Sequence, residues 1–303
     1  MCKVIESLAE YVESINALKQ NYYISLDYTL MTKNEIMNAY IPKFIFRGHS
    51  DDKNFELLPG ALRWKTCGLQ SKTRAYPNTE INMLNDFISD ACRYITQSPT
   101  NDYRAWLEIA QHFGVPTRLL DFTTNPLVAL YFACIENSDK DASVWIVNES
   151  AYRRVFYDII DPIDIIESNR MIEKIIDQTI LNPYEESIEI NQIQYPWIFK
   201  PFCGEERMAS QSSVFMLWGK KRDAFLEFVK PENYMVWDID VNNKEKALIC
   251  KIVIKSSMKS KIIRELDLCG VNEKFIFPGL DGIGKYIKRK YTNMLDDLLC
   301  FNQ

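Results

Sequence analysis

Several features are absent from this 303-residue sequence, and each absence excludes a class of protein. No apolar run approaches the roughly 18 residues that a membrane-spanning helix needs. The first residues lack the pattern of a secretory signal peptide. The cysteines form no Cys-x-x-Cys pair, which argues against a zinc site or a disulfide framework. We therefore expect a cytoplasmic protein without membrane association, whose eight cysteines are free thiols in a reducing environment.

An excess of positive charge is also absent. Lysine and arginine number 36 against 41 aspartates and glutamates, which gives a net charge of -5 and a pI near 5.3. Broad, non-specific affinity for nucleic acid is not expected from this balance, although a local basic patch stays possible. Hydrophobic residues make up 47% and charged residues 25%, which is typical of a soluble domain that buries a substantial core.

The sequence contains no internal repeat and no low-complexity linker. Apolar residues at helical spacing predict helices over residues 3–19, 33–39, 80–96, 102–113 and 256–268, and a C-terminal helix that reaches about Leu299. Short apolar runs predict strands over residues 44–46, 143–148, 195–201, 213–218, 247–254 and about 275–277. Because strands and helices do not alternate regularly, the predicted class is α+β. We expect one domain over residues 1–303, with an N-terminal helical segment at 1–40 and a helical insertion at 150–192.

The stretch from residue 106 to 136 predicts two helices joined by a short polar loop. Gly114 and Pro116 are typical of a helix end, and Pro126 is typical of a helix start. The second helix is apolar almost all round, which indicates burial. Polar groups at the N-terminus of a buried helix can bind an anion, and the loop supplies Thr117, Arg118, Asp121, Thr123, Thr124 and Asn125.

Several motifs together resemble the FRG domain, in order, over about residues 43–290. They are Phe46-Arg47-Gly48-His49, Leu58-Pro59 with Arg63, the block from Gln111 to Pro126 followed by Ala129 to Ala133, Arg207 with Gln211 and Phe215, and Phe277 to Gly282. The family is known mainly from bacterial and phage-associated proteins. The resemblance implies a toxin-like effector in bacterial or phage conflict.

A second, more distant resemblance is to ADP-ribosyltransferases. Those enzymes have a strand ending in Arg or His, which matches Arg47 or His49, and a Ser/Thr-rich turn into a buried helix, which matches Thr123 and Thr124. A later Gln or Glu position matches Glu206 or Gln211. The resemblance implies a small, split β-sheet core surrounded by helices, and NAD as the substrate. One departure is Ser213, which stands where many such enzymes carry their catalytic glutamate.

The expected ligand-binding residues follow from these patterns. Arg47 is suited to a bidentate phosphate contact, or else to a structural ion pair with Asp121 or another buried acid. Asp121, Thr123 and Thr124 cap the buried helix, form a ligand-binding turn, or do both. Arg118, like Arg63, adds positive potential or pairs with surface acids. The predicted cofactor-binding set is therefore Arg47, Gly48, Arg118, Asp121, Thr123 and Thr124.

The predicted catalytic residues are Glu206, Gln211 and His49. The Glu206 carboxylate could stabilise a developing oxocarbenium ion, unless it lies in an exposed turn. Gln211 cannot act as a base but can orient a ribose hydroxyl. His49 could act as a general acid or base, or could be a plain loop residue. The other histidine, His112, is expected to be a core residue.

Three functions are compatible with these residues. The first is an NAD-dependent ADP-ribosyltransferase or NAD glycohydrolase, with a protein or nucleic-acid acceptor and an antitoxin or another defence-system partner. The second is a metal-independent nuclease that uses His49 and His112. The third is a non-catalytic nucleotide-sensing or interaction module in which Arg47 and Arg118 bind phosphate. No metal is expected in any of them.

Overall fold

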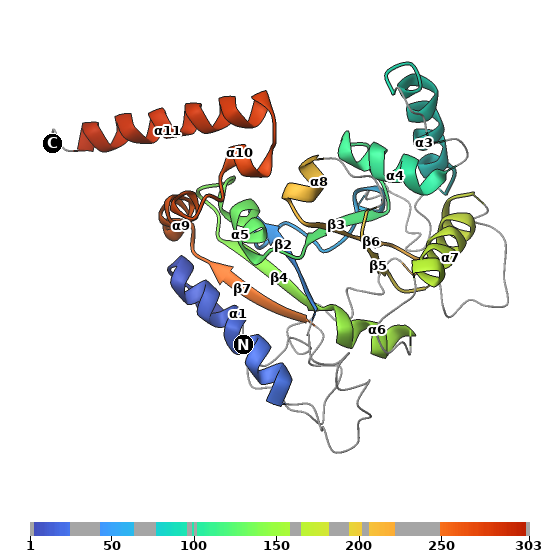
Figure 1. Cartoon of the computed structure of the whole chain (residues 1–303), viewed down its shortest axis with the longest axis horizontal. Helices are drawn as coiled ribbons and strands as arrows, with labels where there is room; N and C mark the ends of the chain where they lie inside the picture. Colours follow the sequence, from blue (N-terminus) through green and yellow to red (C-terminus); the bar gives the residue numbers. More distant parts are fainter. Residues whose placement is uncertain are drawn as a thin grey trace, which may run out of the picture.

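A computed structural model describes residues 3–24, 43–63, 77–95, 99, 102–157, 165–181, 194–201, 206–221 and 249–300. These residues contain one mixed sheet of seven strands in the order β1-β7-β4-β2-β3-β6-β5 (Figure 1). The strands are β1 Lys3–Ile5, β2 Phe44–His49, β3 Leu119–Thr123, β4 Ala142–Asn148, β5 Trp197–Phe199, β6 Ser213–Leu217 and β7 Ile249–Ile254. The predicted mixed α+β class is confirmed.

Helices surround this sheet. They are α1 Leu8–Ile24, the 3-10 helix η2 Gly60–Leu62, α3 Pro77–Ala91, α4 Tyr103–His112, α5 Pro126–Cys134, α6 Glu149–Tyr157, α7 Ile165–Ile176, the π-helix η3 Asp177–Leu181, α8 Glu206–Ser210, α9 Ser256–Leu268, α10 Glu273–Ile276 and α11 Leu280–Cys300. The described parts of the 150–192 region are helical, as predicted. The helix predicted over 33–39 lies outside the described residues.

The sheet consists of two halves that meet at a single residue pair. β2 pairs with β4 over six residues, and β3 pairs with β6 over five. Between the halves, β2 pairs with β3 only at Phe46 and Thr123. The sheet is therefore larger than the expected small, split core. Its seven strands form one sheet, which is nearly divided at its centre but is not split in two.

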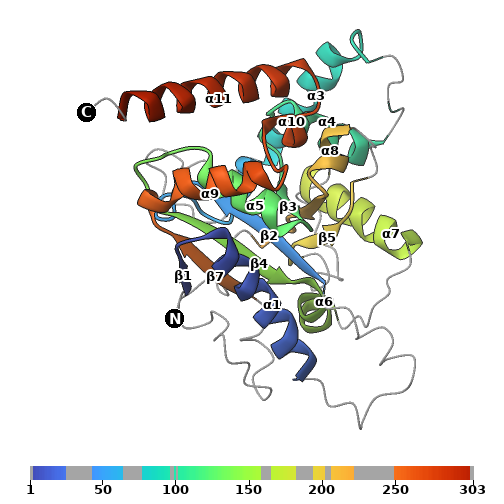
Figure 2. The ribbon, with the colours of Figure 1, turned by 60° about the vertical axis from the view of Figure 1, so that its left-hand side comes forward.

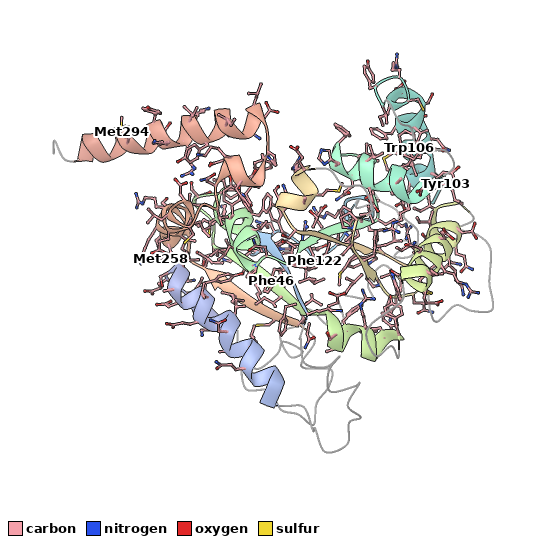
Figure 3. All side chains as sticks on the ribbon, viewed as in Figure 1. Phe46, Tyr103, Trp106, Phe122, Met258 and Met294 are labelled. Atoms are coloured by element: carbon pink, nitrogen blue, oxygen red, sulfur yellow. The ribbon has the colours of Figure 1, made fainter. Side chains whose placement is uncertain are left out.

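Alternation along the strands places apolar residues on both faces of the sheet. Phe44 and Phe46 pack with α1, α5 and α9, whereas Ile45 packs in a second cluster with η2 and α6. A third cluster joins α3, α4 and α7 to the β3-β6-β5 half. Figure 3 shows Phe46 and Phe122 at the centre of the molecule, and Trp106 among the helices beside β5 and β6. This packing holds α5 and α4 on either side of the place where the sheet divides.

Three local predictions are wrong, two of them because of a contact between distant parts of the chain. Residues 3–5 add to β7 as a parallel strand, so the first helix begins only at Leu8. The expected polar loop contains β3, because residues 119–123 pair with β6 about 90 residues later. Residues 273–276 form α10 in place of a strand, with the Asn272 side chain as its cap. At the start of α9, the backbone amide of Ser256 donates to the Asp141 carboxylate at 2.9 Å.

Candidate functional site

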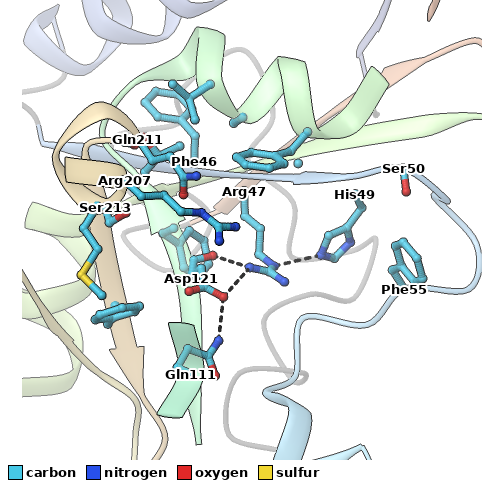
Figure 4. A pocket seen from close by; sticks show the side chains of 18 of the residues that line it. Phe46, Arg47, His49, Ser50, Phe55, Gln111, Asp121, Arg207, Gln211 and Ser213 are labelled. Atoms are coloured by element: carbon cyan, nitrogen blue, oxygen red, sulfur yellow. Dashed lines mark hydrogen bonds and ion pairs between the residues drawn. The ribbon is translucent and has the colours of Figure 1, made fainter. Parts of the chain in front are cut away.

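A cleft of about 360 Å³ opens where β2 and β3 separate beyond the Phe46–Thr123 pair. The end of β2 and the edge of β3 form its floor, and side chains from α4, α5, α8 and the loop after β2 form its walls. Figure 4 shows Arg47 between Asp121 and His49, with Gln111 beyond Asp121 and Phe55 beyond His49. The sequence motifs therefore converge on one place.

Arg47 bridges the gap between the two halves of the sheet. Its Nη1 donates to the backbone carbonyl of Asp121, and the same nitrogen lies 3.8 Å from the Asp121 carboxylate. Arg118 and Thr124, at the two ends of β3, bond to Trp218 and Ser212 at the ends of β6. Because backbone groups alternate in direction along a strand, the carbonyl of Asp121 points to the other side, towards β2. Since β2 has diverged at this point, a guanidinium takes the place of the missing backbone donor.

The charge of Arg47 survives this burial. Burial is the main cause that lowers the pKa of Arg47 to about 10; the Asp121 carboxylate opposes this shift, and the nearby Arg63 charge adds to it. The predicted ion pair of Arg47 with Asp121 is therefore present, and the same cation also lines the cleft. At neutral pH it presents a permanent positive charge to a ligand.

His49 is a neutral residue in this environment. Its side chain is 3% exposed, and burial, followed by the charges of Arg47, Arg63 and Lys251, lowers its pKa to about 2. Its Nε2 accepts a hydrogen bond of 3.3 Å from Arg47 Nε, which assigns the ring proton to Nδ1. Because so low a pKa removes the imidazolium at neutral pH, His49 is suited to positioning Arg47 and not to acting as a general acid.

Gln111 holds the Asp121 carboxylate in place. Its Nε2 donates to Asp121 Oδ2 at 2.8 Å, and its Oε1 accepts from Thr117 Oγ1 at 2.7 Å. The chain can return from α4 to β3 in so few residues because Gly114 adopts a φ of +82°. Gln111 was not among the predicted site residues. Its position at the end of α4, ahead of the predicted Gly114 turn, was the available signal.

Two further arginines line the cleft. Arg63 donates from Nε to the Leu58 carbonyl at 2.6 Å, and the Arg207 guanidinium stacks 4.9 Å from the centre of the Phe277 ring. With Arg47 they make three cations, opposed by two acids in the lining, Asp121 and Glu136. A positively charged cleft in an acidic protein points to an anionic ligand.

Thr123 and Gln211 join β3 to the next elements. Thr123 Oγ1 donates to the Gln211 carbonyl at 2.6 Å and accepts from the Asn125 amide at 2.9 Å. Gln211 Nε2 donates to the Ile276 carbonyl at 3.0 Å, which ties α8 to α10. Both residues line the cleft. Because the Thr123 hydroxyl both donates and accepts a hydrogen bond within the protein, the main role of this residue is to hold β3 to the neighbouring segments.

Three predicted residues lie outside the cleft lining. Arg118 is buried in an ion pair with Glu80, at 2.6 Å, and also bonds to the Gly219 carbonyl at 3.0 Å. Glu206 is exposed on α8, and Thr124 is exposed beside the start of α5. The alternative prediction, that Arg118 pairs with a surface acid, is also wrong, because its partner Glu80 is buried.

Gly48 lines the cleft, but packing already explains why it is glycine. A Cβ added here would overlap the carbonyl oxygen of Ala129 and lie 2.7 Å from the amide nitrogen of Ala133. β2 therefore lies directly on α5, and this contact needs a residue without a side chain.

His112 is not a core residue, because it is partly exposed at the end of α4 and lines the same cleft as His49. A nuclease that uses two histidines needs both in one cleft, and both residues line this one. The low pKa of His49 argues against such a pair, because an imidazole that resists protonation is a weak base and carries no proton to donate at neutral pH.

Lys259 of α9 supports the far rim of the cleft. Its side chain is 1% exposed, and Nζ donates to the carbonyls of Ser50, Glu136 and Asn137 at 2.8–2.9 Å. The buried ammonium group of Lys259 thereby links the loop after β2 to the loop after α5.

The segment that builds most of this cleft can be compared with known families. Residues 42–142 match the FRG domain. The matched segment contains β2, α4, β3 and α5, and so includes Arg47, Gln111 and Asp121. The predicted resemblance is confirmed over this range, whereas the motifs around Gln211 and Phe277 lie beyond the match. No curated protein and no solved structure shows significant similarity to the chain.

Three properties of the described residues bear on the expected class of protein. No helix in the described part of the chain has the length and apolar character that crossing a bilayer requires. Within the same residues, no group of three or more His, Cys, Asp or Glu side chains is arranged to hold a metal ion. Cys92, Cys134, Cys250 and Cys269 are free thiols, as predicted.

Proposed function

We propose that the cleft of this FRG domain binds NAD through its diphosphate. The observation that carries the proposal is the set of three arginines, Arg47, Arg63 and Arg207, around one cleft. Guanidinium groups make charge-assisted, bidentate contacts with phosphate oxygens. A cavity of about 360 Å³ lies within the usual range for small-molecule sites, roughly 300–1,000 Å³.

The proposed reaction is cleavage of the bond between nicotinamide and ribose. Nicotinamide leaves with the bonding electrons, and the oxocarbenium ion is captured by water or by an acceptor nucleophile that gives up a proton. Within the lining, the Asp121 carboxylate is the acid that Gln111 orients. We assign to it the stabilisation of the positive charge, the role first assigned to Glu206. Gln211 would orient a ribose hydroxyl.

The biological role that fits this reaction is a toxin-like effector in bacterial or phage conflict, acting in the cytoplasm. Support comes from the FRG match and from a cleft that is open to solvent beside the exposed residues Arg63 and Arg207. An effector of this kind would modify a protein or nucleic-acid acceptor and would need an antitoxin or another defence-system partner to restrain it.

The test uses the purified full chain and NAD labelled either in nicotinamide or in the adenylate. We expect nicotinamide release, transfer of the adenylate label to water or to added protein, DNA or RNA, and a rise in melting temperature with NAD. Absence of release, of transfer and of the thermal shift would reject the proposal.

A second candidate is a nucleotide-sensing module without turnover. It is favoured by Ser213, which stands at the expected glutamate position and lines the cleft, and by the location of Glu206 outside it. The same experiment separates the two functions, because a sensor gains thermal stability from NAD or ADP-ribose while nicotinamide release stays at the background rate.

A further inference from the structure

The last helix of the described chain carries an exposed apolar stripe. Helix α11 presents five large apolar side chains whose exposures range from 42% to 86%, namely Leu280, Ile283, Ile287, Tyr291 and Met294. At about 100° per residue these positions fall within an arc of about 80° on one face of the helix. Single exposed apolar residues are ordinary, but a continuous stripe of five indicates an interaction surface.

The opposite face of α11 is the one that holds the helix to the body. A Cβ at Gly282 would overlap the Phe277 carbonyl oxygen, and the Arg289 guanidinium pairs with both carboxylate oxygens of Glu273. Both positions lie about 180° to 200° from Leu280 around the helix. The stripe therefore faces away from α10. Figures 1 and 2 show α11 extending from α10 beyond the sheet, and Figure 3 shows Met294 on its outer part.

The width of the stripe indicates what kind of surface it fits. Its successive spacings of three, four, four and three residues contain an 11-residue apolar repeat from Leu280 to Tyr291, which is the repeat of a right-handed coiled coil. A helix that lies on a membrane or covers a globular core needs a broader apolar face, of at least about 100°. The narrow stripe therefore favours a single partner helix over a lipid surface.

Charge on the two sides of the stripe selects among partner helices. Lys288 and Lys290 flank it, one on each side at about 80°, and both are exposed. Two copies of α11 would bring these lysines towards each other, and like charges at flanking positions oppose pairing. We propose that the outer face of α11 docks an amphipathic helix of another protein whose apolar seam is flanked by acidic residues.

The test probes the full chain with two synthetic helical peptides of roughly four heptads. Both carry leucine at the seam positions, and they differ only in having glutamate or lysine at the flanking positions. We expect the acidic peptide to bind about tenfold or more tightly than the basic peptide, measured by calorimetry. Ile287→Asp should weaken the acidic peptide about tenfold or more, whereas Leu268→Asp, at an exposed leucine on α9, should not.

A charge-reversed variant keeps the test decisive. Lys288→Glu with Lys290→Glu should transfer the preference to the basic peptide, which a general loss of folding would not do. Equal affinity for the two peptides, or an Ile287→Asp variant that binds as well as the wild type, would overturn the proposal. Sedimentation that shows a dimer abolished by Ile287→Asp would assign the stripe to a second copy. Binding to anionic vesicles without binding to either peptide would assign it to lipid.

Discussion

Arg47 donates a hydrogen bond to the backbone carbonyl of Asp121, across the gap where β2 leaves β3. One guanidinium thus closes the sheet and supplies positive charge to the cleft that the gap creates. The same residue therefore links the stability of the sheet centre to ligand binding, and the two roles can be separated by substitution.

Arg47→Lys should keep the positive charge but lose the planar guanidinium, whose several N–H donors can bond to Asp121 and to a phosphate at the same time. We expect NAD or ADP-ribose to bind about 10–100-fold more weakly, which corresponds to about 1.4–2.8 kcal/mol. Isothermal titration would measure this. Arg93→Lys, at an exposed arginine paired with Asp90 on the protein surface, is the matched control and should bind as the wild type does. Equal affinities for the Arg47 variant and the control would remove Arg47 from the ligand site.

Asp121→Asn should separate binding from reaction. The amide has nearly the same shape but lacks the negative charge that we assign to stabilising the oxocarbenium ion. We expect the rate of nicotinamide release to fall about 100-fold or more, while the affinity for ADP-ribose changes little or increases. The exposed Asp139, which lies away from the cleft lining, provides the control variant Asp139→Asn. Unchanged turnover in Asp121→Asn would assign the charge stabilisation to another group.

His49 should make the folded state sensitive to acid. Its pKa is about 2 when folded, against about 6.5 for an unfolded histidine. Between these values the unfolded chain holds the extra proton, so this contribution to stability is complete above about pH 6.5 and is lost as the pH falls below it. The slope is at most about 1.4 kcal/mol per pH unit.

Urea denaturation at pH 7.5 and pH 5.5 would measure this dependence. His49→Gln retains an acceptor for Arg47 but cannot take up a proton, so it should lose less stability between the two pH values than the wild type does. Identical losses in both proteins would show that His49 is protonated equally in the folded and unfolded states.

Gly48→Ala should destabilise the fold by about 1–3 kcal/mol or more, because the added methyl group overlaps the backbone of α5 at Ala129. Gly284 in α11 is the matched control, since a Cβ there meets no atom within 4 Å. Gly284→Ala should be neutral or stabilising by up to about 1 kcal/mol, because alanine favours a helix. Urea midpoints of the two variants would test the contrast, and a neutral Gly48→Ala would contradict the close contact of β2 with α5.

The sequence by itself determined the features that depend on neighbouring residues. Asn125 and Pro126 start α5, as local capping chemistry requires, and Gly114 ends the turn of α4 with a positive φ. The residue types and their order along the chain also predicted Arg47, Asp121, Thr123 and Gln211 as site residues, and all four line one cleft.

The tertiary structure decided which polar residues share the cleft. β3 exists because its partner β6 lies about 90 residues away, and no local pattern of five residues encodes that pairing. Arg118 and Arg47 look alike in sequence, yet Arg118 meets the buried Glu80 whereas Arg47 meets the opening between strands. The physical reason is that a charge is stabilised by the groups around it in space, and those groups come from distant parts of the chain.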